Sequence, residues 1–186
     1  MVSEILAALR QDHRNLGQML AAVERQLARF DQGETPDYDI LQGVLDYCLS
    51  YPDLYHHPKE DLVYGRLRRR NPATAEAIGD LQAEHRSLGA ATRRFAAAVR
   101  NVLQDLQIPR DSFDRVAREF LEAYRRHMAM EDSAFFPAAE AHLTAADWAA
   151  IEAEATAQSD PVFGAKGEAR FAALRADILA WAKEEG

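Results

Sequence analysis

The sequence predicts an all-α fold, an up-down-up-down four-helix bundle with one or two extra helices at the C-terminal end. Two observations support this prediction. Non-polar residues recur at steps of three and four along four long stretches, which is the period of an amphipathic helix. Short segments that contain Gly, Pro, Asp or Asn separate these stretches, as expected of tight connections between antiparallel helices.

The four stretches define the expected helices of the bundle. The non-polar positions run from Leu6 to Phe30, from Leu41 to Leu67, from Ile78 to Leu106 and from Phe113 to Ala134. The segment "GETPD" at 33–37 separates the first two stretches. With short connections, four helices of this length are expected to pack side by side around one core.

Capping signals set the expected starts of the third and fourth helices. In "NP" at 71–72, Asn71 is the expected N-cap of the third helix, and Pro72 its first residue, where a missing N–H costs nothing. The segment "IPRDS" at 108–112 ends that helix and offers Asp111 or Ser112 as the cap of the fourth.

Two prolines, Pro52 and Pro58, fall inside the second helical stretch. Proline within a helix removes one hydrogen bond and clashes with the carbonyl group four residues earlier. We therefore expect this helix to be kinked or restarted at "HHPKED", residues 56–61.

Beyond the bundle, expected to span 1–143, residues 144–186 are expected to form a helical extension. A short helix should follow Thr144, "SDPVFGAKG" at 159–167 should be a loop, and a last helix should carry Phe171, Leu174, Ile178 and Trp181. This apolar stripe must cover the bundle or pair with a second copy, so both a monomer and a homodimer remain open.

Composition limits the location and the partners of the protein. The net charge of −8 argues against nucleic acid and anionic membranes, and no apolar run approaches the length of a membrane span. The N-terminal residues lack the order of a secretory signal. The single cysteine, Cys48, excludes an intramolecular disulfide, and the cytoplasm is the expected compartment.

Polar residues interrupt the four apolar stripes at matching depth. They are His13 in the first stripe, His56 and Glu60 in the second, His85 in the third, and His127 and Glu131 in the fourth. The spacing of four puts each paired His and Glu on one face of a helix. A carboxylate in a core is costly unless a cation compensates it, so this pattern predicts a metal site.

The pattern also repeats within the chain. "DHRNLG" (12–17) resembles "EHRSLG" (84–89), and "HHPKED" resembles "HMAMED" (127–132), with offsets of 71 or 72 residues. Two similar hairpins would offer two metal ions two histidines each, with both carboxylates between the ions. Imidazole and carboxylate without thiolate suit iron or manganese, and zinc would also fit.

Three assignments near the site stay open. His57 and Asp61 have the same spacing as His56 and Glu60, but the match with "HMAMED" favours His56 as the ligand. Asp61 and Asp132 are expected to act as outer groups or to face solvent. Tyr124, one turn before His127, faces either the site or the core.

These motifs, in this order, resemble the hemerythrin HHE cation-binding domain family in its bacterial stand-alone form, over roughly residues 3–140. The resemblance implies a non-haem di-iron centre in which histidines are terminal ligands and two carboxylates bridge the ions. Carried onto this chain, the terminal ligands are His13, His56, His85 and His127, and the bridges are Glu60 and Glu131.

One departure from the family pattern bears on function. Oxygen-carrying hemerythrins have a fifth histidine from a His-x-x-x-His pair on the third helix, whereas here Gly89 lies four residues after His85. The expected site therefore has four histidines and open coordination positions, and reversible oxygen storage is not predicted.

Three functions compete. In the first, a di-iron protein binds oxygen, nitric oxide or peroxide at an open metal position, for sensing or a stress response. In the second, a di-iron enzyme disposes of peroxide or nitric oxide, with Tyr124 the one candidate proton donor. In the third, a metal-stabilised bundle acts through an unidentified protein partner.

Overall fold

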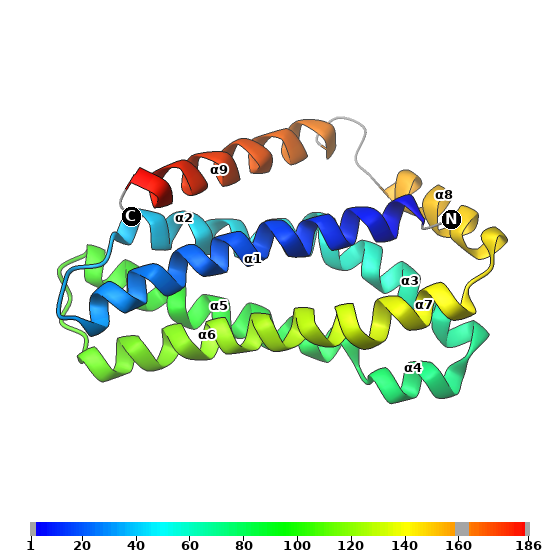
Figure 1. Ribbon diagram of the computed structural model, residues 1–186, viewed down its shortest axis with the longest axis horizontal. Helices are drawn as coiled ribbons and strands as arrows, with labels where there is room; N and C mark the ends of the chain where they lie inside the picture. Colours follow the sequence, from blue (N-terminus) through cyan, green and yellow to red (C-terminus); the bar gives the residue numbers. More distant parts are fainter. Residues whose placement is uncertain (1–2, 159–163, 185–186) are drawn as a thin grey trace.

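A computed structural model describes residues 3–158 and 164–184, and this part of the chain is helical, without strands. The predicted all-α bundle with extra C-terminal helices is confirmed (Figure 1). The elements are α1 (Glu4–Asp31), α2 (Tyr38–Cys48), η1 (Pro52–His56), α3 (His57–Arg70), α4 (Pro72–Ile78), α5 (Leu81–Leu103), α6 (Arg110–Met130), η2 (Glu131–Phe135), α7 (Phe136–His142), α8 (Ala145–Gln158) and α9 (Gly164–Glu184).

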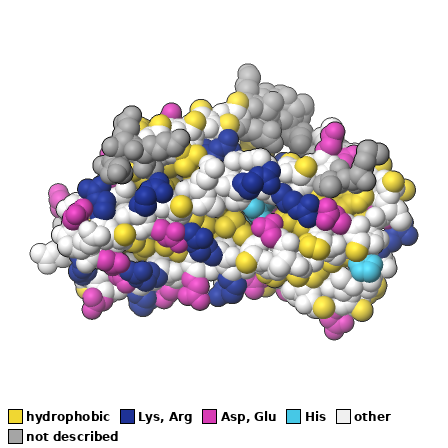
Figure 2. Space-filling view, in the orientation of Figure 1, with side chains coloured by type: hydrophobic (Ala, Val, Ile, Leu, Met, Phe, Trp, Pro, Cys, Tyr) yellow, Lys and Arg dark blue, Asp and Glu magenta, His cyan; other side chains and the backbone are white. Residues whose placement is uncertain are grey.

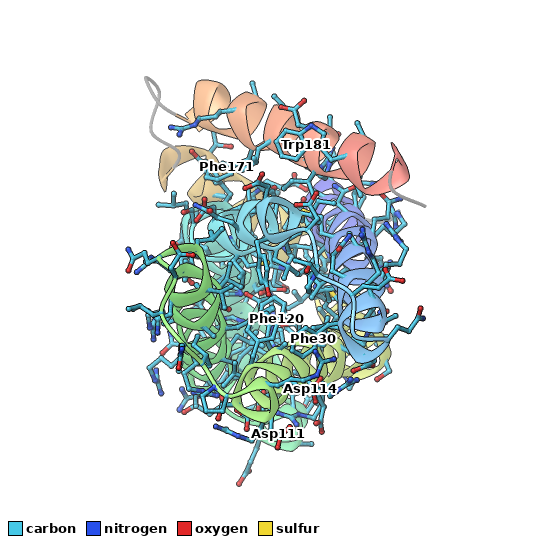
Figure 3. The ribbon with its side chains drawn as sticks, turned by 90° about the vertical axis from the view of Figure 1, so that its left-hand side faces the viewer. Phe30, Asp111, Asp114, Phe120, Phe171 and Trp181 are labelled. Carbon is cyan, nitrogen blue, oxygen red and sulfur yellow. The ribbon has the colours of Figure 1, made fainter. Side chains whose placement is uncertain are left out.

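Four long rods make up the bundle: α1, then α2 with η1 and α3, then α5, and finally α6 with η2 and α7 (Figure 1). Seen along the bundle, Phe30 and Phe120 point into the space between the rods (Figure 3). The apolar core consists of two separate main clusters. One contains Leu20, Leu45, Phe95 and Phe120. The other contains Leu6, Leu67, Phe135 and Phe136.

The surface differs sharply from this core. On the face that carries α1 and α6, side chains of both charge signs are interspersed, and histidine is visible only in small areas (Figure 2). None of the described helices is both long and apolar enough to cross a membrane.

The third helix begins later than predicted. Asn71 is an N-cap, as expected, since its side chain accepts a hydrogen bond from the N–H of Thr74 at 3.1 Å, but it caps the short helix α4. Gly79 ends α4 with φ +98°, a left-handed conformation that favours glycine. A second cap follows, because Asp80 accepts from the N–H of Ala83 at 3.0 Å and starts α5.

The expected cap of the fourth helix was wrong. α6 begins at Arg110, with Pro109 in the position before it, and no side chain caps it. Asp111 and Ser112 lie inside the first turn. There the charge of Asp111 still interacts favourably with the N-terminal end of the helix dipole.

The second and the fourth rod each contain a wider helical turn just before a proline, Pro58 in the second and Pro137 in the fourth. η1 ends two residues before Pro58, and η2 ends two residues before Pro137. Both segments are π-helical. A proline lacks the N–H that would bond four residues back and its ring crowds that carbonyl, so the wider π turn relieves both problems. The predicted interruption at 56–61 is therefore a change of register within one rod.

The C-terminal helices pack on the bundle, α8 against α3 and α9 along α2 and α1 (Figure 1). Thr144 starts α8, as predicted, exchanging hydrogen bonds with Asp147. The predicted loop at 159–167 is wrong from Gly164 on, because α9 begins there; residues 159–163 lie outside the described part. The division into domains at residue 143 stays a prediction.

A glycine allows the close approach of α9 to α2. A Cβ atom at Gly43 would lie 3.0 Å from Cγ1 of Ile178, and Ile178 is fully buried. The contact with this side chain therefore anchors the helix. Nearer the start of α9, the ring of Phe171 packs against the rings of Tyr47, Tyr51 and Tyr55 of the second rod. Figure 3 shows Phe171 on the α9 side of the bundle.

Replacing Ile178 by Ala should lower the free energy of unfolding by about 2–5 kcal/mol, the usual loss when a buried Ile or Leu side chain is truncated. Denaturant titration measures this loss. Leu103→Ala is the control, since Leu103 is 45% exposed and its truncation leaves no buried cavity. Equal effects of the two substitutions would mean that α9 is not anchored through Ile178.

Candidate metal centre

Seven titratable side chains meet between the two hydrophobic clusters. They come from all four rods: His13 from α1, His56 from η1, His57 and Glu60 from α3, His85 from α5, His127 from α6, and Glu131 from η2. Each is at most 9% exposed, and the two glutamates are fully buried. The centre is thus a polar layer across the bundle that separates the two clusters.

Glu60 faces histidines from three rods. Its Oε1 lies 3.0 Å from Nε2 of His56 and 3.9 Å from Nε2 of His13. Its Oε2 lies 3.3 Å from Nε2 of His85. The two oxygens of one carboxylate therefore point to different sets of imidazoles.

Glu131, in the other half of the chain, also faces histidines from three rods. Its Oε2 lies 3.2 Å from Nε2 of His13 and 3.3 Å from Nε2 of His127. Its Oε1 lies 3.9 Å from Nε2 of His85. Each glutamate thus faces histidines on both sides of the centre.

The donor atoms form two overlapping groups. His13, His56, Glu60 and Glu131 make one group, and His57, Glu60, His85 and His127 make the other. Within each group the donor atoms lie within 4.8 Å of one another. Ligands about 2.1 Å from an ion are separated by at most about 4.2 Å, so a small contraction would let each group hold a cation.

All six residues predicted as ligands lie in these groups, and the structure adds His57 to them. Sequence reasoning weighed His56 against His57, but both side chains are buried in the centre, which makes five clustered histidines instead of four. In a regular α-helix neighbouring side chains point about 100° apart. The junction of η1 with α3 falls between these two residues, and the wider turn lets both face inward.

The centre contains buried polar atoms that have no hydrogen-bond partner in the described part of the chain. They are Nε2 of His13, His85 and His127, Nδ1 of His127, and all four carboxylate oxygens of Glu60 and Glu131. Buried polar atoms without partners are rare because each costs free energy. Bound cations would satisfy the converging nitrogens and oxygens together, so the donor set fits metal ions.

Three of the imidazoles have an aspartate within hydrogen-bond distance of their Nδ1 atom. Nδ1 of His13 lies 3.1 Å from Asp132, Nδ1 of His56 lies 3.2 Å from Asp12, and Nδ1 of His57 lies 3.0 Å from Asp53. A carboxylate at one ring nitrogen leaves the other free to bind a metal and makes it more basic. Asp132 was expected as an outer group; Asp12 and Asp53 were not identified from the sequence.

In the metal-free centre, positive imidazoles partly compensate the negative carboxylates. Burial alone would lower the pKa of His56, but Glu60 and Asp12 raise it to about 10. Burial would also lower the pKa of His85, yet Glu131 and Glu60 raise it to about 9. Although burial opposes its ionisation, Glu60 has a pKa well below the ordinary value because of His56 and His85.

The pKa values of the other two imidazoles of the second group, those of His57 and His127, are lowered instead of raised. Burial, with His85 close by, lowers the pKa of His57 to about 3. Its ring stacks on that of His85 with centroids 3.8 Å apart. Burial also lowers the pKa of His127, to about 4. At neutral pH the rings of His56 and His85 are therefore charged and those of His57 and His127 neutral. For the fifth ring, His13, burial lowers the pKa but Glu131 raises it above the ordinary value, so the buried carboxylates are partly compensated before a metal binds.

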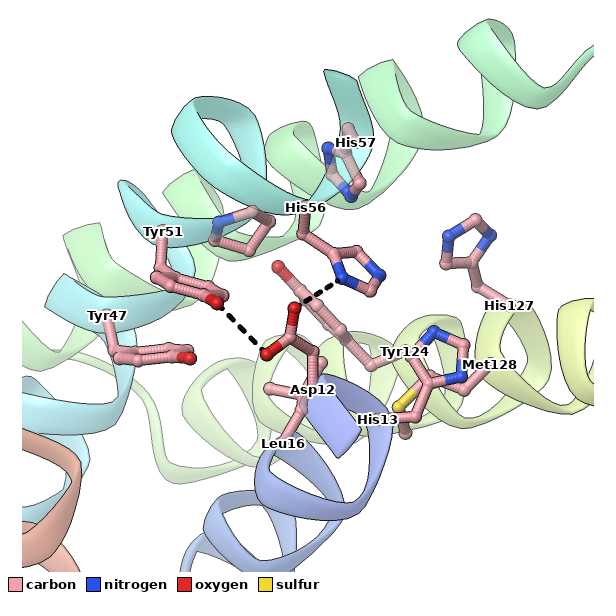
Figure 4. Close-up of a pocket in the computed structure, with 11 residues that line it drawn as sticks. Asp12, His13, Leu16, Tyr47, Tyr51, His56, His57, Tyr124, His127 and Met128 are labelled. Carbon is pink, nitrogen blue, oxygen red and sulfur yellow. Dashed lines mark hydrogen bonds and ion pairs between the residues drawn. The ribbon is translucent and has the colours of Figure 1, made fainter. Parts of the chain in front are cut away.

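A small cavity adjoins the centre (Figure 4). Its volume is about 20 Å³, room for one water-sized molecule. Four imidazoles and Asp12 line one side, and the remaining wall is aromatic and apolar, formed by Leu16, Tyr47, Tyr51, Pro52, Tyr124 and Met128. The hydroxyl group of Tyr51 donates to Asp12 at 2.9 Å, which links this wall to His56 (Figure 4).

The comparison with protein families agrees with this geometry. The model of the hemerythrin HHE cation binding domain matches residues 4–139, which include all seven side chains of the centre. The chain belongs to this family. No curated protein and no solved structure matches it. Membership supports a metal-binding, hemerythrin-like protein, in which the buried His and Glu groups are the candidate ligands.

Metal loading of this hemerythrin-like centre should release protons. Because His56 and His85 carry protons at neutral pH and a metal ion binds the unprotonated ring, these two rings should together release about two protons per chain at pH 7. A pH indicator in weak buffer measures the release. Metal affinity should therefore increase as the pH rises toward about 9 to 10 and fall on acidification. Loading without proton release would contradict the charged state of these rings.

Proposed function

We propose that the seven side chains hold two non-haem iron ions. His13 and His56 would be terminal ligands of one ion, and His57, His85 and His127 those of the other, with Glu60 and Glu131 between them. Both glutamates face histidines of both groups, which supports the bridging assignment. Manganese or zinc would satisfy the same donors, but nitrogen and carboxylate ligands without thiolate suit iron well.

The unequal ligand sets suggest where a small molecule binds. Two terminal histidines leave the first ion with fewer protein ligands than the second, and the cavity is lined by two histidines of each group, His13 and His56 of the first and His57 and His127 of the second. Iron at this position would supply the change of oxidation state on which binding of such ligands depends. The cavity, with room for one water-sized molecule, limits the ligand to a diatomic gas or peroxide.

We conclude that the protein binds oxygen, nitric oxide or peroxide for sensing or a stress response. The observation that carries this conclusion is the cavity of about 20 Å³ against the ligand histidines. We place this role in the cytoplasm, where reducing conditions would keep the buried thiol of Cys48 free. A sensing output would pass through an unidentified protein partner, and the state of the chain as monomer or homodimer stays a prediction.

A redox enzyme that disposes of peroxide or nitric oxide is the second candidate. The observation that favours it is the hydrogen-bonded chain from Tyr51 through Asp12 to His56, which could deliver a proton to the cavity. Tyr124 is a weaker donor than the sequence suggested. Its hydroxyl group donates to the carbonyl oxygen of Cys48 at 3.4 Å, and burial raises its pKa well above the ordinary value.

Ligand substitutions test the metal assignment. His57→Ala should remove one of two metal ions, because it takes a nitrogen from the second group only. Glu60→Ala or Glu131→Ala should cost both ions, since each carboxylate faces both groups. Elemental analysis of protein from iron-supplied cells measures the metal content. His142→Ala is the control, because His142 is exposed at the end of α7. Unchanged metal content in the glutamate variants would refute the bridging assignment.

Filling the cavity tests the ligand assignment. Leu16→Phe should reduce the cavity volume and weaken or abolish the absorption change when nitric oxide or peroxide is added, with metal content unchanged. Leu103→Phe on the surface is the control. Turnover of peroxide by the iron-loaded protein, lost in Tyr51→Phe, would instead favour the enzyme. No spectral response to any of the three ligands would rule out both small-molecule functions.

A further inference from the structure

A second opening reaches the centre beside His57 and His85. It is a surface hollow of about 270 Å³ formed by residues of η1, α3 and α5. Its lining includes His57 and His85, which also belong to the second donor group. The hollow and the centre therefore share two imidazoles.

We propose that this hollow is the route by which a divalent cation enters the centre, and that two carboxylates bind the cation transiently on the way, Asp53 at the mouth and Asp61 further in. The inference rests on the metal centre proposed above. It assigns a loading function to carboxylates that lie outside the two donor groups.

The two carboxylates lie where an arriving cation would meet them. Asp53 is 69% exposed at its side chain, and its Oδ1 lies 3.0 Å from Nδ1 of His57. Asp61 uses Oδ2 for a long hydrogen bond from Gln82, at 3.4 Å. Its Oδ1 is buried and has no hydrogen-bond partner among the described residues, so this oxygen lies at the inner part of the hollow and Asp53 at its mouth. Carboxylate oxygens are ligands that hard divalent cations prefer.

The inner end of the hollow leads directly to donor atoms. His57 and His85 are more than nine-tenths buried, and their rings stack. Nε2 of His85 has no hydrogen-bond partner and lies 3.3 Å from Glu60. A cation that leaves the aspartates therefore meets the neutral ring of His57 and the ring of His85, which must release its proton, and then the buried carboxylate of Glu60.

Other sides of the centre are less suited to a hydrated ion. The cavity on the tyrosine side has room for one water-sized molecule, whereas a hydrated divalent cation carries about six waters. Beside His13, the ring of Phe136 stacks at 5.2 Å, and the guanidinium of Arg10 lies over that ring. The hollow of about 270 Å³ has room for an ion with part of its water shell.

Two positive groups oppose the two carboxylates: the ring of His85 at the inner end, whose pKa burial lowers but Glu131 and Glu60 raise to about 9, and the guanidinium of Arg86 nearer the surface. Arg86 also lines the hollow, and its Nη2 lies 3.9 Å from Asp80. Its side chain is 70% exposed, so replacing it should leave the fold intact. Loss of the charge of Arg86 should speed the entry of a cation, whereas loss of the charge of Asp61 should slow it.

The experiment follows Co²⁺ uptake by the metal-free full chain, using visible absorption in a stopped-flow instrument at low ionic strength. Asp61→Asn should slow uptake about threefold and Asp61→Lys about tenfold, and Arg86→Gln should speed it about threefold, magnitudes typical of electrostatic steering. Release to a chelator should change in the same direction as uptake, because a residue on the route affects both rates. Metal content at saturation should not change.

Asp46→Lys is the matched control, an equal charge change on α2 at an exposed position outside the hollow. If Asp61→Lys and this control give equal uptake rates, the route is wrong. The same holds if uptake slows while release becomes faster, since the substitution then weakens the bound state. Circular dichroism checks that each variant is folded, and Arg86→Gln remains as the independent test. If the unmodified chain takes up no Co²⁺, the proposed metal centre itself fails.

Discussion

Two fully buried carboxylates in the middle of a helical bundle are the constraint on which the rest of this structure depends. An ionised carboxylate without a partner in a protein interior costs several kcal/mol, so the surrounding residues must compensate Glu60 and Glu131. Every rod of the bundle contributes an imidazole at this depth, and two of these rings have strongly raised pKa values. The apolar core is consequently split into two clusters, one on each side of the polar layer.

The aspartates behind the imidazoles tie the rods together. Asp12 on α1 holds His56 of the second rod, and Asp132 on the fourth rod holds His13 of α1. These hydrogen bonds fix the rings before a metal arrives, which reduces the ordering needed on binding. The centre therefore contributes to the alignment of the helices as well as to their chemistry.

The two openings to the centre differ in kind. The cavity has aromatic and apolar walls and room for one small molecule. The hollow carries exposed carboxylate and has room for a partly hydrated ion. Such a division would let the metal and the small ligand reach the same donor atoms by separate ways. It would also keep bulk water away from the side on which the ligand binds.

The sequence by itself determined the four helical stretches, the interruption near Pro58 and the six polar positions at equal depth, because helical periodicity is a local property of the chain. Only the tertiary structure shows the register of the helix near Pro58 and the contacts between side chains of different rods. The wider turn before Pro58 changes the register, so that His56 and His57 both face the centre, where a regular helix would admit one. Asp12 acquires its role only when α1 meets the second rod in space, whereas Asp53 lies four residues before His57, a spacing that the sequence already contains. Gly79, through its left-handed backbone, moves the start of the third helix to Leu81.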